Sequence, residues 1–175
     1  MKKLLIITVL SIVMLSCENN SADLVIGSTI GSNGESSEIV VGDLSNQQVW
    51  VDYIDAHNER DLEKIAEINT DNWTGYAPNG NVVRGNDAHI EFLDEWFKST
   101  ANPKWKVKWM IANRGEDVDG NIVEFLTTGN DIMFMDDDGN EVVENHVHDI
   151  MFENGKITNV FVYSRPAPVQ ESVEE

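Results

Sequence analysis

The chain has 175 residues, of which 31 are acidic and 12 basic, and its formal net charge is -19. This length suits one domain with a hydrophobic core of its own. DNA and RNA are bound by neutralising phosphates with lysine and arginine, so a chain this acidic is not expected to bind nucleic acid. The single cysteine, Cys17, allows no internal disulfide and no cysteine-rich zinc site.

The first 16 residues have the pattern of a secretory signal peptide. Two lysines precede a short apolar run over residues 4–15, which is too short to span a membrane comfortably. Residues 14–17, Met-Leu-Ser-Cys, resemble the lipobox of bacterial lipoproteins, which implies cleavage before Cys17 and a lipid on its thiol. We therefore expect a protein anchored by lipid to the bacterial cell envelope, on the outer membrane and facing the periplasm or the cell surface. An ordinary secreted protein and an uncleaved anchor are the alternatives.

The segments on either side of the expected domain are polar. Residues 17–43 are rich in serine, glycine, asparagine and acid, with two short apolar islands at 24–26 and 39–41. Such a composition predicts a flexible tether. Residues 167–175 read as an acidic tail. The folded domain is therefore expected over residues 44–166.

The first half of this domain has the periodicity of helices. The first helix is expected to be capped by Ser45 and the second by Asp61, since both residues favour the N-cap position. A third helix follows Gly85, with Asn86 or Asp87 as its cap. These patterns predict three helices in the N-terminal half of the domain.

The second half has the alternation and the turns of strands. Apolar residues alternate with lysines along the first of them, so one face is expected to be buried; the apolar positions are Trp105, Val107, Trp109 and Ile111. Lys104, Lys106 and Lys108 between them are expected to form a solvated strand edge. Gly-containing turns at 119–121, 136–140 and 153–155 then separate further strands. The predicted fold class is α+β, with three N-terminal helices packed on a curved antiparallel sheet.

Residues 44–166 resemble the nuclear transport factor 2 superfamily, which includes SnoaL-like polyketide cyclases and ketosteroid isomerases. Four segments carry the resemblance: residues 51–62, the helix from Gly85 to Phe97, Leu126-Thr-Thr-Gly129, and residues 149–157. The resemblance implies a cone-shaped fold with a mostly apolar pocket between helices and sheet. It does not by itself give a function, because this superfamily contains enzymes and binding proteins alike.

The family's catalytic positions are only partly filled. Ketosteroid isomerases use a tyrosine and a protonated aspartate to stabilise an oxyanion and a second aspartate to move the proton. The resemblance places Tyr53 at the tyrosine, His148 at the oxyanion-binding acid and Tyr76 at the proton-moving aspartate. A tyrosine with a pKa of about 10 is a poor base at neutral pH, which argues against steroid isomerisation. The catalytic aspartate of SnoaL-like cyclases also falls on His148, whose imidazole is a credible base.

An aromatic pocket is expected from alternation and family spacing. Its predicted lining residues are Tyr53, Trp73, Tyr76, Trp96, Phe125, His146, His148, Phe161 and Tyr163. Such walls favour a flat apolar ligand with one or two polar groups. His146 and His148 could bind a metal together with Asp131 or Glu144, but there is no second ligand motif, so neither a metal nor a cofactor is expected.

Three functions remain open from the sequence. The leading one is a lipid-anchored protein that binds a small hydrophobic or aromatic molecule in its pocket. The second is a cyclase, isomerase or dehydratase that uses His148 and Tyr53, with Asp131 as the third member of a triad. The third is an interaction module that forms a homodimer or docks another envelope protein through its sheet.

Overall fold

The computed structural model describes residues 23–99, 101–117 and 119–168. The expected signal peptide, Cys17 and the chain from residue 169 onward lie outside these residues. In chain order the elements are β1 (Val25–Ile30), β2 (Ser36–Val41), α1 (Ser45–Glu59), α2 (Leu62–Ile68), β3 (Asn69–Tyr76), β4 (Val82–Arg84), α3 (Asn86–Lys98), β5 (Lys104–Glu116), β6 (Ile122–Met135), β7 (Glu141–Glu153) and β8 (Lys156–Pro166). Among the described helices, none is long and apolar enough to cross a membrane.

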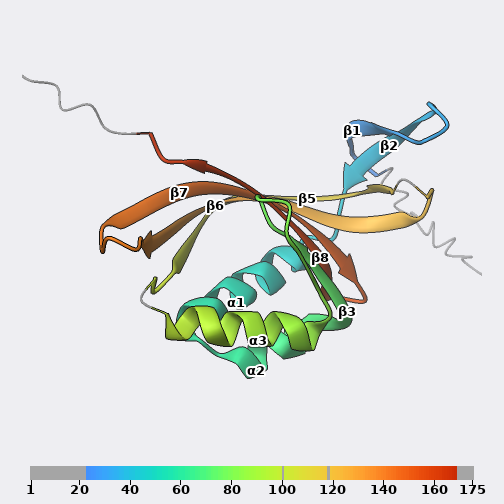
Figure 1. Cartoon of the computed structure of the whole chain (residues 1–175). Helices are drawn as coiled ribbons and strands as arrows, with labels where there is room; N and C mark the ends of the chain where they lie inside the picture. Colours follow the sequence, from blue (N-terminus) through green and yellow to red (C-terminus); the bar gives the residue numbers. More distant parts are fainter. Residues whose placement is uncertain (1–22, 100, 118, 169–175) are drawn as a thin grey trace, which may run out of the picture.

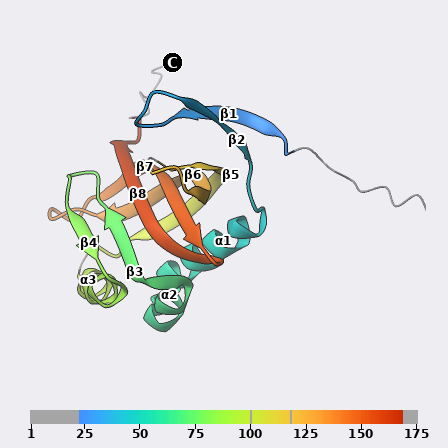
Figure 2. The same cartoon turned by 90° about the vertical axis from the view of Figure 1, so that its right-hand side faces the viewer.

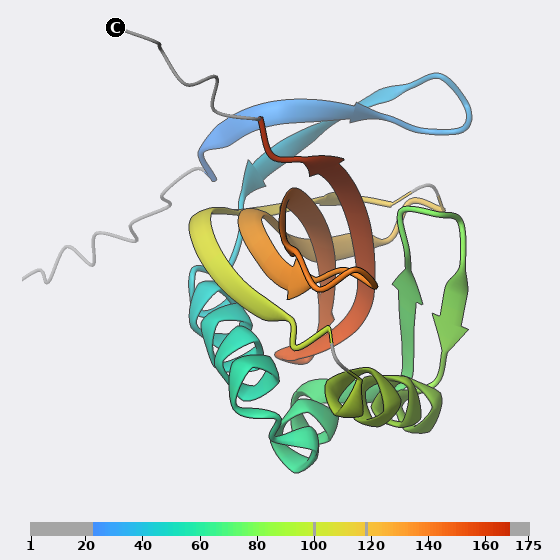
Figure 3. The same ribbon diagram turned by 60° about the vertical axis from the view of Figure 1, so that its left-hand side comes forward.

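The strands form one sheet in the order β1-β2-β5-β6-β7-β8-β3-β4. Neighbouring strands are antiparallel except β3 and β8, which are parallel. The three helices lie on one side of the sheet (Figure 1). Figure 3 shows how strongly strands β5 to β8, coloured yellow to red, curve around that side. Among the described elements, the helices therefore cover the inner face of the sheet and leave the outer face uncovered.

The α+β class is confirmed, but the helices are not all N-terminal to the strands. Strands β1 and β2 precede α1, and β3 and β4 lie between α2 and α3. In Figure 2 these last two strands stand beside β8, above α3. The sequence predicts a strand and a turn at this place, but the parallel pairing of β3 with β8 depends on chain segments more than 80 residues apart.

The flexible tether predicted over residues 17–43 contains a β-hairpin in its described part. Its two apolar islands pair with each other, with Val25 opposite Val40. Gly34, at a φ of +80°, closes the turn between them by donating to the carbonyl of Gly31. Val40 and Val41 then pair with β5. The tether prediction is wrong here because composition alone does not reveal that two weak apolar segments can order each other.

The N-cap residue predicted from the sequence is confirmed at one of the three helices. The Asp61 carboxylate accepts a hydrogen bond from the backbone N–H of Lys64 at 2.9 Å and so caps α2 as predicted. Ser45 is the first residue of α1 and not its cap. Helix α3 is preceded by Gly85 at a φ of +91°, a conformation that suits glycine.

A β-bulge in β5 reverses the faces of that strand. Val107 pairs with Asn130 and Trp109 pairs with Gly129, so Lys108 is an extra residue without an opposite partner. Beyond the bulge Met110 and Ala112 turn to the core, whereas Trp109 is 45% exposed. The predicted inward alternation therefore holds for Trp105 and Val107 and fails for Trp109 and Ile111.

The core occupies one end of the space between helices and sheet. Leu126, Ile150 and Ile157 are fully buried there against α1 and α2. Each such side chain contributes about 1.5 to 3 kcal/mol by leaving water. Along β7 the inward side chains pass from Ile150 in this core to His148 and His146 at the other end. That other end is not filled.

Candidate ligand-binding cavity

A cavity of about 390 Å³ lies between the inner face of the sheet and helices α1 and α3. Aromatic and aliphatic side chains make most of its wall; the larger ones are Trp50, Tyr53, Trp73, Tyr76, Phe92, Leu93, Trp96, Trp105, Ile132, Val160 and Val162. Among the described residues, the lining contains no aspartate, glutamate, lysine or arginine. In a chain with a net charge of -19 this makes the cavity an uncharged compartment.

All four histidines of the chain line this cavity. Burial lowers the pKa of His57 to about 4 and the pKa values of His89 and His148 to about 3. The cause is the cost of placing a charged imidazolium in an apolar surrounding. These three side chains are therefore neutral at pH 7, and each keeps one ring nitrogen able to accept a hydrogen bond.

Two of these histidines belong to a row of polar side chains along the inner face of β7. His146 Nε2 lies 3.0 Å from a carboxylate oxygen of Glu144, and His148 Nε2 lies 3.4 Å from His146 Nδ1. On the other side, the Asn130 amide nitrogen lies 3.4 Å from His148 Nδ1. An amide nitrogen can only donate, so the protons of both imidazoles point along the row toward Glu144. Glu144 therefore orients His146, whose Nδ1 carries the lone pair.

Tyr53 stands on the opposite wall, on α1, and is 3% exposed. Burial raises its pKa far above the usual value, against the opposing influence of Asn69 and Trp73 beside it. The phenol therefore keeps its proton and acts as a hydrogen-bond donor. One turn further along α1, His57 Nδ1 donates to the Tyr53 carbonyl oxygen at 2.7 Å, which leaves Nε2 as an acceptor.

Six of the nine residues predicted to line the pocket lie on the wall of this cavity: Tyr53, Trp73, Tyr76, Trp96, His146 and His148. The other three, Phe125, Phe161 and Tyr163, lie on the opposite face of the sheet. Their neighbours Leu126, Val160 and Val162 point inward instead. Because strand side chains alternate between faces, an error of one residue in the register removes a side chain from the site altogether.

Asp131 is also on the outer face, so the predicted triad with Tyr53 and His148 does not form. Its neighbour Asn130 points into the interior, where its amide meets His148. The Asp131 carboxylate accepts hydrogen bonds from Lys108 Nζ at 3.1 Å and from the Asn145 amide at 2.7 Å. Lys108 therefore takes part in an ion pair and is not simply a solvated edge residue.

Sequence reasoning missed several residues of the site. Trp50, His57 and His89 line the cavity from helices, although their helical spacing placed them on apolar faces. Sequence reasoning weighed Glu144 only as a metal ligand beside His146 and His148, and its place two residues before His146, on the same strand face, puts it in contact with that imidazole. Among the described residues, no group of three or more histidine, cysteine, aspartate or glutamate side chains is arranged to hold a metal ion.

Comparison with solved structures places the fold. SalBIII, an epoxide hydrolase/cyclase-like enzyme with a role in pyran ring formation in the polyether salinomycin, superposes with a TM-score of 0.55 at 21% identity, over 69% of this chain and 91% of that one. A candidate ketosteroid isomerase from Kribbella flavida superposes with a TM-score of 0.52 at 15% identity, over 74% of this chain and 87% of that one. A candidate SnoaL-like polyketide cyclase from Shewanella denitrificans superposes with a TM-score of 0.54 at 13% identity, over 70% of this chain and 92% of that one. At these identities the likeness establishes a shared NTF2-like fold.

No protein with curated annotation is detectably similar to the chain in sequence. The family model described as "SnoaL-like domain" matches residues 50–160, more than half of the chain. This match runs from within α1 to the first half of β8 and includes almost all of the cavity wall. The chain therefore belongs to the SnoaL-like domain family.

Proposed function

We propose that this domain binds a small, flat, uncharged molecule in the cavity between helices and sheet. The carrying observation is the composition of the wall, which has aromatic and aliphatic side chains, the neutral His57, His89 and His148, and no aspartate, glutamate, lysine or arginine among the described residues. The volume of about 390 Å³ falls within the range of small-molecule sites. An ion would lose its hydration in such a cavity without a compensating partner, so neutral ligands are favoured.

Polar groups on the wall support a ligand with one or two hydrogen-bonding atoms. The Tyr53 hydroxyl can donate to a carbonyl or hydroxyl oxygen, and His57 Nε2 can accept from a hydroxyl. Each satisfied pair would stabilise the complex by about 1 kcal/mol and would fix the orientation of the ring. The binding would need no cofactor.

Two tryptophan substitutions on β4 test the cavity. Val83 lines the cavity, whereas the adjacent Val82 is 41% exposed and points away from it. We expect 2-naphthol, a neutral flat probe, to raise the melting temperature of the wild type and of Val82→Trp but not of Val83→Trp, whose indole would fill the site. The charged analogue 2-naphthalenesulfonate should have a much smaller effect. Equal shifts for both variants would contradict binding in this cavity.

The Glu144–His146 pair favours acid–base catalysis as a second candidate function. The Glu144 carboxylate fixes the orientation and tautomer of the His146 imidazole, and solved structures with this fold are described as a candidate polyketide cyclase and a candidate ketosteroid isomerase. His146 Nδ1, engaged only by the long contact from His148, is the atom that would accept a proton from the ligand. His148 is a weaker base, because burial lowers its pKa to about 3.

Proton exchange at a ketone tests this candidate. 2-Tetralone is neutral and flat and carries acidic hydrogens beside its carbonyl. In D₂O, wild-type protein should accelerate exchange of these hydrogens, followed by NMR, while His146→Asn should bind the ketone equally but lose the acceleration. Glu144→Gln should retain part of it. Undiminished exchange by His146→Asn would rule out this residue as the base.

We also propose that the mature protein begins at Cys17 and is anchored through lipid on that residue in the bacterial envelope. The support is the lysine-led apolar segment over residues 1–16 and the sequence Met-Leu-Ser-Cys. Cells fed a clickable palmitate analogue should label the wild-type protein and not Cys17→Ser. Equal labelling of both would refute the anchor.

A further inference from the structure

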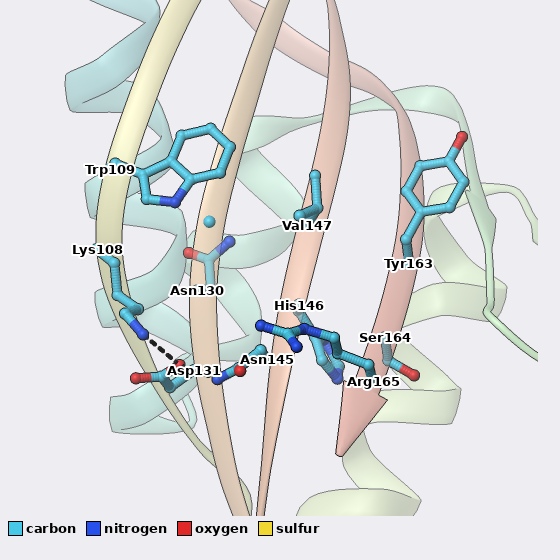
Figure 4. A pocket seen from close by; sticks show the side chains of 11 residues that line it. Lys108, Trp109, Asn130, Asp131, Asn145, His146, Val147, Tyr163, Ser164 and Arg165 are labelled. Carbon is cyan, nitrogen blue, oxygen red and sulfur yellow. Dashed lines mark hydrogen bonds and ion pairs between the residues drawn. The ribbon is translucent and has the colours of Figure 1, made fainter. Parts of the chain in front are cut away.

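We propose that the outer face of the sheet carries a second binding site, for an aromatic carboxylate, separate from the cavity. The outer groove, as we call it, has a volume of about 350 Å³. Its residues come from strands β5 to β8, and the side chains that form its walls lie on the side of the sheet away from the helices (Figure 4). This site does not rest on the proposed function of the cavity.

The upper half of the groove is an apolar trough between two aromatic rings. Trp109, Gly129, Val147 and Tyr163 are paired in a single row across β5, β6, β7 and β8. The two aromatic residues stand at the ends of the row; the Trp109 indole reaches over Gly129, and Val147 forms the floor between the two rings (Figure 4). Trp109 is 45% exposed and Tyr163 is 57% exposed. Large aromatic surfaces left in water on either side of a shallow floor suit a flat ring between them.

The position of Trp109 is built into the backbone. The bulge at Lys108 turns Trp109 to the outer face, where its indole lies on Gly129. A Cβ atom at Gly129 would come within 2.1 Å of Trp109 Nε1, so only glycine leaves room for the ring. Contact with the sheet on one side therefore holds the indole in place, while the other side remains available to a ligand.

The lower half of the groove carries a positive charge. Asp131, Asn145 and Arg165 form the next row across β6, β7 and β8, and the Arg165 side chain extends toward Asn145 (Figure 4). The Asp131 carboxylate already accepts hydrogen bonds from Lys108 and Asn145. Within residues 23–99, 101–117 and 119–168 no carboxylate forms an ion pair with Arg165. The groove thus combines two cations with one carboxylate, although the chain as a whole carries -19.

These two halves together define the ligand. Arg165 has no carboxylate partner among the described side chains; its guanidinium can bind a carboxylate through two parallel hydrogen bonds, and the trough above it accepts an aromatic ring. An aromatic carboxylate satisfies both at once. A second copy of the chain is a poorer occupant, because it would bring two grooves with an excess of positive charge against each other.

The test uses 2-naphthoate and its neutral analogue 2-naphthamide as probes. Both are titrated by calorimetry into Val83→Trp protein, in which the cavity is filled, so that only the groove is available. We expect naphthoate to bind roughly tenfold more tightly than naphthamide, with the difference shrinking at high salt. Arg165→Gln should abolish the preference for the carboxylate, and Trp109→Ala should weaken both probes. Both residues are exposed, so neither change threatens the fold.

Three results would overturn the proposal. The first is equal affinity of naphthoate for Arg165→Gln and its parent, and the second is equal affinity of the two probes for the parent. The third is a sedimentation experiment in which the wild type is a dimer and Trp109→Ala is a monomer. That result would make the groove an interface between two copies of the chain. Failure of 2-naphthol to bind the wild type would remove the cavity function and leave this result unchanged, so the two proposals fail separately.

Discussion

The indole of Trp73 lies parallel to the imidazole of His89, with ring centroids 3.7 Å apart and 11° between the planes. Burial lowers the pKa of His89 to about 3, so this is a stack of two neutral rings and not a cation on an aromatic face. His89 Nδ1 also accepts from the Asn69 amide at 3.1 Å. The strand β3 and the helix α3 are thereby joined at the cavity wall.

Gly75→Ala should disturb this wall. A Cβ atom there would come within 2.3 Å of the Trp73 ring, so the indole must move and its stack on His89 must change. We expect a loss of about 1 to 3 kcal/mol in the free energy of unfolding, typical of overpacking, together with weaker binding of 2-naphthol. Urea denaturation and calorimetry measure the two effects. Gly27→Ala, where the new Cβ would make only ordinary contacts, is the matched control.

The stability of the protein should fall as the pH is lowered from about 6.5 to 5. Unfolded histidines titrate near a pKa of about 6.5, whereas His57 titrates at about 4 and His89 and His148 at about 3 in the folded protein. Over this window the unfolded chain therefore binds protons that the folded chain does not. Once its unfolded form is protonated, each of these histidines lowers the free energy of unfolding by about 1.4 kcal/mol for every pH unit of acidification. Urea melts at pH 7.5, 6 and 5 give the slope.

His148→Asn should reduce that slope by the contribution of one proton, since asparagine does not titrate. A free energy of unfolding that stays constant between pH 7.5 and 5 in the wild type would show that the buried histidines are protonated in the folded state.

Removal of the β1–β2 hairpin should leave the domain folded. The hairpin pairs with the sheet through Val40 and Val41, Asp23 before it forms an ion pair with Arg114 of β5, and none of its described residues lines the cavity. Protein that begins at Gly42 should therefore keep its circular dichroism spectrum and its affinity for 2-naphthol, with a lower melting temperature. Loss of the cooperative thermal transition would instead make the hairpin part of the folding unit.

Asp61→Ala should lower the free energy of unfolding by about 1 kcal/mol. The substitution leaves the backbone N–H of Lys64 at the start of α2 without its side-chain acceptor. Asp61→Asn, which can still accept, should restore most of the loss. An alanine variant as stable as wild type in urea would mean that water replaces the cap at no cost.

Sequence patterns predicted the parts of this molecule that depend on local periodicity. The three helices follow from apolar spacing and capping residues, and alternation along β7 correctly put His146 and His148 on one face. The resemblance to SnoaL-like proteins supplied the fold and the position of the cavity.

What sequence reasoning missed depends on strand pairing. Whether Asn130 or Asp131 faces inward is decided by the register of β6 against its neighbours, which no local pattern records. The bulge at Lys108 also has no signature in the alternation that precedes it. In the same way, the β1–β2 hairpin forms because two short apolar segments pair with each other, and neither segment would fold alone.

Lys108 has a consequence for how relatives of this chain should be compared. One extra residue decides that Trp109 belongs to the outside of the molecule and Met110 to the inside. A relative that keeps a residue at this position but pairs it regularly, without the bulge, would have the following side chains on the opposite faces, so its tryptophan would enter the cavity. The presence or absence of the bulge is therefore more informative about ligand size than the identity of any one aromatic residue along β5.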